Sequence, residues 1–231
     1  MVEITRELLV VSDAWREAFP GAHAGVLAMS NVSNPAECAA LEEKKNELEI
    51  SLRSQLGNLD RATLRSIPML RAYAAHYRKF DKTYHLQLQL ESIAFKGKAI
   101  PTAAALVEAM FMAELNSMLL TAGHDLDLIR GQLTLDVTRG AESYRLMRGV
   151  TQSTKAGDMV ISDAEGIISS IVYGPDERTQ IRPETTEVIF TTYAPTGIGV
   201  EAIEAHLNEM RQNVQLVAPS ARVGLLRVLS A

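Results

Sequence analysis

The chain has 231 residues, a formal net charge of −5, 47% hydrophobic residues and 22% charged residues. This balance is ordinary for a globular protein, and the length suits one large domain or two small ones. The negative charge argues against broad, non-specific binding to nucleic acids, although it leaves room for a local basic face.

The single cysteine, Cys38, excludes an intramolecular disulfide and fits a reducing compartment. The first residues, MVEITRELLVVSD, carry acidic side chains and only a short apolar run, which is not the pattern of a signal peptide. No stretch approaches the ~18 apolar residues of a membrane span. These features predict a cytoplasmic location and no membrane partner.

The first quarter of the chain alternates helical and extended patterns. Apolar residues at roughly helical spacing predict a helix over residues 1–20, and the run AHAGVLAMSNV predicts a buried strand over residues 22–32. A further helix is predicted over residues 34–56. Asn34 would be its N-cap, and Pro35 would occupy the first helical position.

Helical periodicity continues to about residue 120. It resumes over residues 60–80, with a break near Pro68, and again over residues 86–95. Residues 101–120 carry the strongest helical pattern in the chain. Because this segment is apolar nearly all round, it predicts a central, buried helix.

Beyond Gly123 the apolar pattern changes from a period of 3.6 residues to a period of 2. Turn-forming residues separate five predicted strands, at residues 132–138, 143–147, 158–163, 167–173 and 187–193. A last helix is predicted over residues 200–213, and the tail up to Ala231 has no clear pattern. A mostly helical first half and a sheet-rich second half predict an α+β fold, with residues 1–231 forming a single domain.

The order of four segments resembles the tRNA-binding B-three/B-four domain. These segments are AIPTAAALVEAMFMAELNSMLLTAGHDLDLI, GQLTLDVTRGAESY, GDMVISDAEG and ERTQIRPETTEVIFTTY. That domain forms the editing module of the phenylalanyl-tRNA synthetase beta subunit and also exists as free-standing proteins. The resemblance covers residues 77–195, which leaves a helical N-terminal part (1–76) and a C-terminal helix and tail (196–231).

The resemblance implies a mixed, sandwich-like β-sheet packed with helices. It also implies a free-standing editing domain that binds the aminoacylated end of a tRNA and hydrolyses a mischarged aminoacyl-tRNA ester in trans. An aminoacyl-tRNA synthetase would be a further partner, and no cofactor, metal or DNA is expected. The alternative is a non-catalytic module that binds RNA or an amino acid in association with a synthetase.

The resemblance places a pocket for the amino acid around Ala122 and Thr191. Two side chains depart from the synthetase pattern there. The synthetase has a histidine at the position of Ala122, and within a residue of Thr191 it has a glutamate that recognises the tyrosine hydroxyl. Specificity for tyrosine is therefore not carried over. Hydrolysis itself needs only a modest lowering of the activation barrier, because an aminoacyl ester is already activated. A positioned water and backbone hydrogen-bond donors to the oxyanion can supply much of that lowering.

His124 is the remaining titratable candidate for a catalytic role, since the pKa of a histidine is easily shifted to a value near neutral pH. It would otherwise be a turn histidine bonded to Asp125 or Asp127. Those two aspartates either contact the substrate or bond the backbone of the turn. Glu108 lies on an apolar helix, where a lone carboxylate is costly, so it either faces the pocket or pairs with an arginine.

The stretch from residue 61 to residue 98 is locally basic, with tyrosines 73, 77 and 84 interleaved. This combination is a candidate for a tRNA-contacting face, with Arg71, Arg78, Lys79 and Lys82 as the contacting residues. The alternative is an ordinary solvent-exposed helical surface, because such surfaces in α+β proteins have a similar composition. The histidines lie far apart without the spacing of metal ligands, so no metal site is predicted.

Overall fold

A computed structural model describes residues 7–231. The α-helices are α1 (Asp13–Ala18), α2 (Ala39–Leu56), α3 (Arg61–Ser66), α4 (Pro68–Arg78), α5 (His85–Lys96), α6 (Ala105–Ser117) and α7 (Val200–Val217), with one 3-10 turn, η1 (Leu126–Leu128). The strands are β1 (Leu9–Val11), β2 (His23–Ser30), β3 (Leu120–Asp125), β4 (Leu133–Val137), β5 (Ser143–Arg145), β6 (Thr151–Ser153), β7 (Met159–Asp163), β8 (Gly166–Ser170), β9 (Gly174–Pro175), β10 (Glu187–Ala194) and β11 (Arg222–Ser230).

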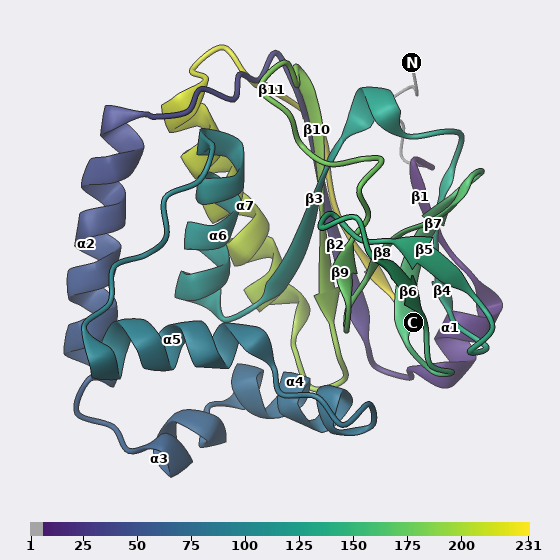
Figure 1. Cartoon of the computed structure of the whole chain (residues 1–231), viewed down its shortest axis with the longest axis horizontal. Coiled ribbons are helices and arrows are strands. Elements are labelled where there is room, and N and C mark those ends of the chain that lie inside the picture. Colours follow the sequence, from purple (N-terminus) through teal and green to yellow (C-terminus); the bar gives the residue numbers. More distant parts are fainter. Residues whose placement is uncertain (1–6) are drawn as a thin grey trace.

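The strands form two main sheets and a small ribbon. The central sheet has the order β11-β2-β10-β3 and is antiparallel throughout. The second sheet has the order β1-β4-β7-β8-β9 and is mixed, because β1 runs parallel to β4 while the other neighbours are antiparallel. Figure 1 shows α6 and α7 against one face of the central sheet, α2 outside them, and the second sheet on the opposite side. The predicted α+β class with a mixed sheet packed with helices is thus confirmed.

Most of the predicted elements are present with small shifts at their ends. Pro68 separates α3 from α4, as expected of a residue that occupies the first turn of a helix. Gly97 ends α5 in the left-handed conformation, with φ of 64°. The predicted buried helix exists as α6, but it begins at Ala105 and ends at Ser117.

The helix predicted over residues 1–20 is only partly correct in its described part. Residues 9–11 form β1, which pairs with β4, and only Asp13–Ala18 is helical. Residues 1–6 lie outside the described part of the chain. The apolar run at residues 8–11 is rich in valine and leucine, and a parallel neighbour strand decides its conformation where periodicity alone cannot.

Asn34 does not cap α2, because that helix begins at Ala39. Its side chain instead accepts a hydrogen bond from the N–H of Leu106 at 3.0 Å and donates one to the carbonyl of Arg182 at 3.0 Å. Asn34 therefore caps α6, a helix some seventy residues further along the chain. The tail, which showed no pattern, forms β11 beside β2.

Candidate functional site

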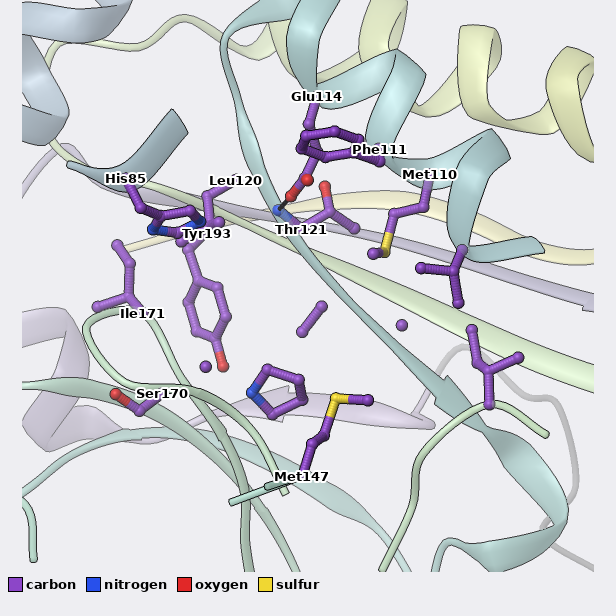
Figure 2. A pocket seen from close by; sticks show the side chains of 16 residues that line it. His85, Met110, Phe111, Glu114, Leu120, Thr121, Met147, Ser170, Ile171 and Tyr193 are labelled. Carbon is purple, nitrogen blue, oxygen red and sulfur yellow. Dashed lines mark hydrogen bonds between the residues drawn. The ribbon is translucent and has the colours of Figure 1, made fainter. Parts of the chain in front are cut away.

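A pocket opens at the free edge of β3, which is the last strand of the central sheet. Its volume is about 230 Å³, below the ~300–1,000 Å³ common for drug-sized ligands, and therefore suited to a small group. Figure 2 shows the pocket between α6, β3 and the turn after β8. Most of its surface is apolar, and its larger lining residues are Val107, Met110, Phe111, Leu120, Met147, Ile171, Ile181 and Tyr193.

The turn between α6 and β3 brings the two elements together. Met118 ends α6 with φ of 63°, a left-handed conformation, and its N–H donates to the carbonyl of Glu114 at 2.7 Å. The chain then reverses directly into β3. At Gly123 an added Cβ would lie 2.9 Å from Cδ1 of Ile181 and 3.1 Å from Sδ of Met110, so a glycine keeps this wall of the pocket open.

Glu114 is the acidic residue of the pocket wall. It is 4% exposed, and its Oε1 accepts a hydrogen bond from the N–H of Thr121 at 2.6 Å. Burial raises the pKa of Glu114 to about 8, and the hydrogen bond from Thr121 acts in the opposite direction. In the free protein this carboxyl group is therefore largely protonated at pH 7.

Thr121, on the same wall, joins a buried polar network. Its hydroxyl lies 2.7 Å from Nε2 of His206 and 3.0 Å from the hydroxyl of Thr192. Nδ1 of His206 lies 2.8 Å from the hydroxyl of Ser117, which donates its proton to the carbonyl of Ala113. Nδ1 must therefore carry the ring proton, and Nε2 accepts from Thr121. Burial lowers the pKa of His206 to about 4, so its ring is neutral at pH 7.

The opposite wall contains a second polar pair. Ser170 lines the pocket and donates to Oδ2 of Asp158 at 2.6 Å. Burial raises the pKa of Asp158 to about 7, while the bond from Ser170 opposes this rise. Ser170 thus presents a hydroxyl group to the pocket, while Asp158 lies behind it and is not among the lining residues. His85 also lines the pocket, and burial lowers its pKa.

Of the residues predicted around the pocket, Ala122 lines it. Thr191 pairs with Ala122 in the neighbouring strand and is fully buried, with its hydroxyl 3.4 Å from the carbonyl of Ala122. Thr191 is not among the residues that line the pocket. The two residues are thus adjacent, but only one of them reaches the cavity.

His124 is fully buried on β3 and is not among the pocket-lining residues. Its Nδ1 contacts the hydroxyl of Thr179 at 2.7 Å, so its partner is neither of the two aspartates considered from the sequence. Thr179 gives its own proton to Asp176, which leaves Nδ1 of His124 as the donor. Burial, followed by the charge of Arg178, lowers the pKa of His124 to about 3.

The acidic candidates have structural partners. Asp125 accepts from the N–H of Asp127 at 3.1 Å and from the hydroxyl of Thr185 at 2.7 Å, which fixes the turn after β3. Asp127 is exposed. Glu108 is buried and lies 2.7 Å from Nζ of Lys45, so its partner is a lysine where an arginine was expected.

Three of the four cations predicted to contact RNA lie together. Arg71, Arg78 and Lys82 line a groove of about 530 Å³ beside α4, together with Arg65 and without any acidic side chain. Lys79 is exposed but lines a different, smaller hollow near Phe19. Nζ of Lys82 lies 5.8 Å from the centre of the Tyr173 ring, and Tyr173 directly precedes the pocket residue Gly174.

The interleaved tyrosines offer almost no ring surface to this groove, although Tyr84 is among its lining residues. Tyr73, Tyr77 and Tyr84 are at most 1% exposed, and their rings pack against one another in the core. They are thus unable to stack on bases, and the prediction that they contribute to an RNA-contacting face is wrong. Tyr73 and Tyr77 lie four residues apart on the buried face of α4, and Tyr84 directly precedes α5.

Sequence reasoning missed Glu114 and Thr121. Glu114 carries the same signal that drew attention to Glu108, since both are carboxylates on the apolar helix α6. Thr121 had no signal, because the sequence did not predict β3. Within residues 7–231 no group of three or more His, Cys, Asp and Glu side chains could hold a metal ion. No helix in that range has the length and apolar character needed to cross a bilayer.

The fold and the pocket define an α+β domain with a small apolar site at the edge of its central sheet. The sequence matches the model of the B3/4 domain over residues 69–213, and the chain belongs to that family. The resemblance seen in the sequence is thereby confirmed, over a longer range than residues 77–195.

Among solved structures, the chain is similar to an N-terminal fragment of the phenylalanyl-tRNA synthetase beta subunit from Pyrococcus horikoshii. The identity is 11% and the TM-score is 0.49, with 96% of this chain and 52% of that chain covered. The chain thus spans about half the length of that fragment. No curated protein matches the sequence.

Proposed function

We propose that the chain binds the aminoacylated end of a tRNA and hydrolyses the ester of a mischarged amino acid in trans. The observation that carries this proposal is the small apolar pocket at β3, lined by Ala122, in the segment where the family resemblance places the amino acid. A pocket of about 230 Å³ suits a single amino acid side chain.

The edge of β3 offers a donor for the ester carbonyl. The N–H of Thr121 points to Glu114 and that of Asp125 donates to the carbonyl of Thr179 at 2.8 Å, so both point away from β10. Because alternate residues of a strand direct their N–H groups to the same side, the N–H of Gly123 faces this edge too. We assign it to the ester oxygen that becomes negative as water attacks.

In this reaction water adds to the carbonyl carbon, the bond to the ribose oxygen breaks, and a proton from the water ends on the released ribose hydroxyl. The ester is already activated, so positioning and the backbone donor supply much of the required acceleration. His124 stays the sequence-based candidate for proton transfer. Since it is buried behind Thr179, His124→Asn tests the assignment: a drop in turnover with unchanged stability supports it, and unchanged turnover removes it.

The basic groove supports an RNA ligand. Arg65, Arg71, Arg78 and Lys82 supply positive charge without a nearby acid in the groove lining, which suits phosphate oxygens. Lys82 of the groove lies 5.8 Å from the ring centre of Tyr173, and the next residue in the chain, Gly174, lines the pocket. One ligand carrying both phosphates and an aminoacyl group would occupy the two places together.

A panel of tRNAs, each charged with a correct or an incorrect amino acid, tests the proposal. Release of one or a few amino acids above the uncatalysed rate, lost when the groove cations are removed, is the expected result. No release from any member of the panel overturns the enzymatic proposal.

The second candidate is a non-catalytic module that binds RNA or an amino acid in association with a synthetase. It is favoured by Ala122, which places a methyl group where the synthetase pattern has a histidine, and by the absence of His124 from the pocket lining. Saturable binding of tRNA without any turnover would support this module over the enzyme. Co-purification of an aminoacyl-tRNA synthetase would identify the partner.

A further inference from the structure

The buried glutamates of the chain differ in one respect. Four glutamates in residues 7–231 are less than 9% exposed. Three of them have a basic partner: Glu49 lies 2.7 Å from Arg53, Glu91 lies 3.2 Å from Arg61, and Glu108 lies 2.7 Å from Lys45. Within the described residues the fourth, Glu114, forms no ion pair, although it is buried as deeply as the others.

Glu114 is also the one of these four that lines the pocket. Its Oε1 is held by the N–H of Thr121 at 2.6 Å, which fixes the carboxyl group at the wall that α6 provides (Figure 2). A buried carboxylate without a cation costs free energy, and the group stays protonated instead. A cation that enters the pocket would remove that cost. It would play the part for Glu114 that a lysine or an arginine of the protein plays for each of the other three glutamates.

The rest of the pocket excludes other charged groups as ligands. No lysine or arginine lines it, and burial lowers the pKa of His85, the one histidine in the lining, so the charge that would compensate a carboxylate or a phosphate is disfavoured there. The walls formed by Met110, Phe111 and Ile181 suit an apolar group next to the charge. The geometry thus fits a small apolar molecule that carries one positive charge.

We propose that Glu114 is the counter-ion for a protonated amine of the ligand, and that the pocket selects a free α-ammonium group attached to an apolar side chain. This inference deepens the proposed function, on which it rests for the identity of the ligand as an aminoacyl group. Free α-amines would be accepted, whereas N-acylated ones, which have no charge, would be rejected.

The probes are L-amino-acid amides with side chains from methyl to benzyl, each paired with its N-acetyl derivative. Amides resist the hydrolysis proposed for esters, so binding is measured without turnover. Titration followed by calorimetry, or by the methyl resonances of Met110 and Met147, gives the affinities. We expect at least one free-amine amide to bind and its N-acetyl derivative to bind at least tenfold more weakly.

The variant Glu114→Gln keeps the size of the side chain and an oxygen for the N–H of Thr121, but removes the charge. It should lose the discrimination between the free and the acetylated amides. Glu43→Gln is the matched control, because Glu43 is exposed on α2, outside the pocket lining, and this variant should discriminate like the wild type. Discrimination by the wild-type chain needs no variant and is therefore independent of how well Glu114→Gln folds.

Equal binding of the free and the acetylated amides by the wild type overturns the inference. Discrimination that persists in Glu114→Gln, or no binding of any amide, overturns it too. The outcome is separable from the proposed function. Amine selection without hydrolysis of any aminoacyl-tRNA leaves the inference in place and removes the enzyme, whereas hydrolysis without amine selection does the reverse.

Discussion

The hydroxyl oxygen of Thr121 lies 2.7 Å from Nε2 of His206, and this contact joins the edge strand β3 to α7. The two residues are 85 positions apart in the sequence. Through Thr121, the wall of the pocket that contains Glu114 is linked to the buried network of His206 and Ser117. The position of the pocket wall therefore depends on a hydrogen bond that forms only in the folded chain.

The first prediction concerns His206 and acid. Because the folded-state pKa of His206 is about 4, below its unfolded value of about 6.5, the unfolded chain binds a proton more readily between these pH values. The contribution of His206 is therefore complete above pH ~6.5 and is lost as the pH falls toward 4. His206→Gln should lose less stability than the wild type over this range, by on the order of 3 kcal/mol.

Chemical denaturation at several pH values measures this difference. His76 and His124 also have lowered pKa values, through burial in each case, so the comparison is made between wild type and variant. A constant difference in unfolding free energy from pH 7 to pH 4 would contradict the prediction.

The second prediction concerns Glu114, whose contribution to stability changes with pH in the opposite direction to that of His206. Its folded-state pKa of about 8 lies above the ordinary value, so the folded chain holds a proton that the unfolded chain releases. The wild type should therefore lose stability relative to Glu114→Gln as the pH rises from about 4.5 to about 8, by on the order of 3–5 kcal/mol. The control Glu43→Gln should follow the wild type.

Other titratable groups near Glu114 are Tyr73 and Tyr84 in the core, His85 and Tyr193 in the pocket lining, and His206 behind Thr121. Burial raises the pKa values of the tyrosines, which therefore stay neutral in this range. The pKa values of both histidines are lowered by burial, and both are present in wild type and variant alike. An unchanged pH dependence in Glu114→Gln would show that Glu114 does not titrate in this range.

The third prediction concerns the buried pair of Lys45 and Glu108, which joins α2 to α6 at 2.7 Å. Lys45→Met should destabilise the fold by ~3–5 kcal/mol, because it leaves a carboxylate buried without a cation. The double variant Lys45→Met/Glu108→Leu should recover most of this loss, since neither charge remains. Thermal or urea unfolding of the two variants provides the measurement, and equal losses in both would exclude a coupled pair.

The fourth prediction concerns Ala122, the pocket residue where the synthetase pattern has a histidine. Ala122→His places an imidazole in the pocket beside the N–H of Gly123. If an aminoacyl ester occupies the pocket, this general base should raise its hydrolysis by ~10²-fold or more. Ala122→Asn, similar in size but without a titratable group, is the control. No gain with histidine, in a variant of unchanged stability, would argue that the ester lies elsewhere.

The fifth prediction concerns the basic groove. Arg71→Ala, Arg78→Ala and Lys82→Ala should each weaken tRNA binding and reduce its salt dependence by about one released counterion. Lys98→Ala removes an exposed cation outside the groove lining and should have little effect. The sequence alone predicts that Lys79→Ala weakens tRNA binding. Because Lys79 lies outside the groove, the structure predicts little effect. Filter binding at several salt concentrations distinguishes these results.

The sequence predicted local features well. Periodicity identified α6 as a central helix, and β4, β5, β7, β8 and β10 each overlap a predicted strand. Strands β6 and β9 were not predicted, and β9 consists of Gly174 and Pro175, residues typical of a turn. The features that were predicted depend on neighbours within a few residues, so a single sequence carries them. The order of the segments also indicated the B3/4 family, which the family match confirms.

Long-range pairing was beyond the sequence. Strand β1 forms against β4, and β11 forms against β2 across most of the chain length. Asn34 looked like the cap of the next helix but caps α6 instead. Each of these residues satisfies its backbone or side-chain hydrogen bonds with a partner that becomes a neighbour only after folding.

At the candidate site, too, some features follow from the sequence and others only from the tertiary structure. The sequence by itself determined an α+β domain of this family and a local excess of basic residues, since residue type and order are enough for these. Only the tertiary structure decided that His124 is buried behind Thr179, and that Glu114 faces a cavity without a cation. Burial and pairing of charges depend on elements brought together from distant parts of the chain, and these fix which titratable groups can meet a ligand.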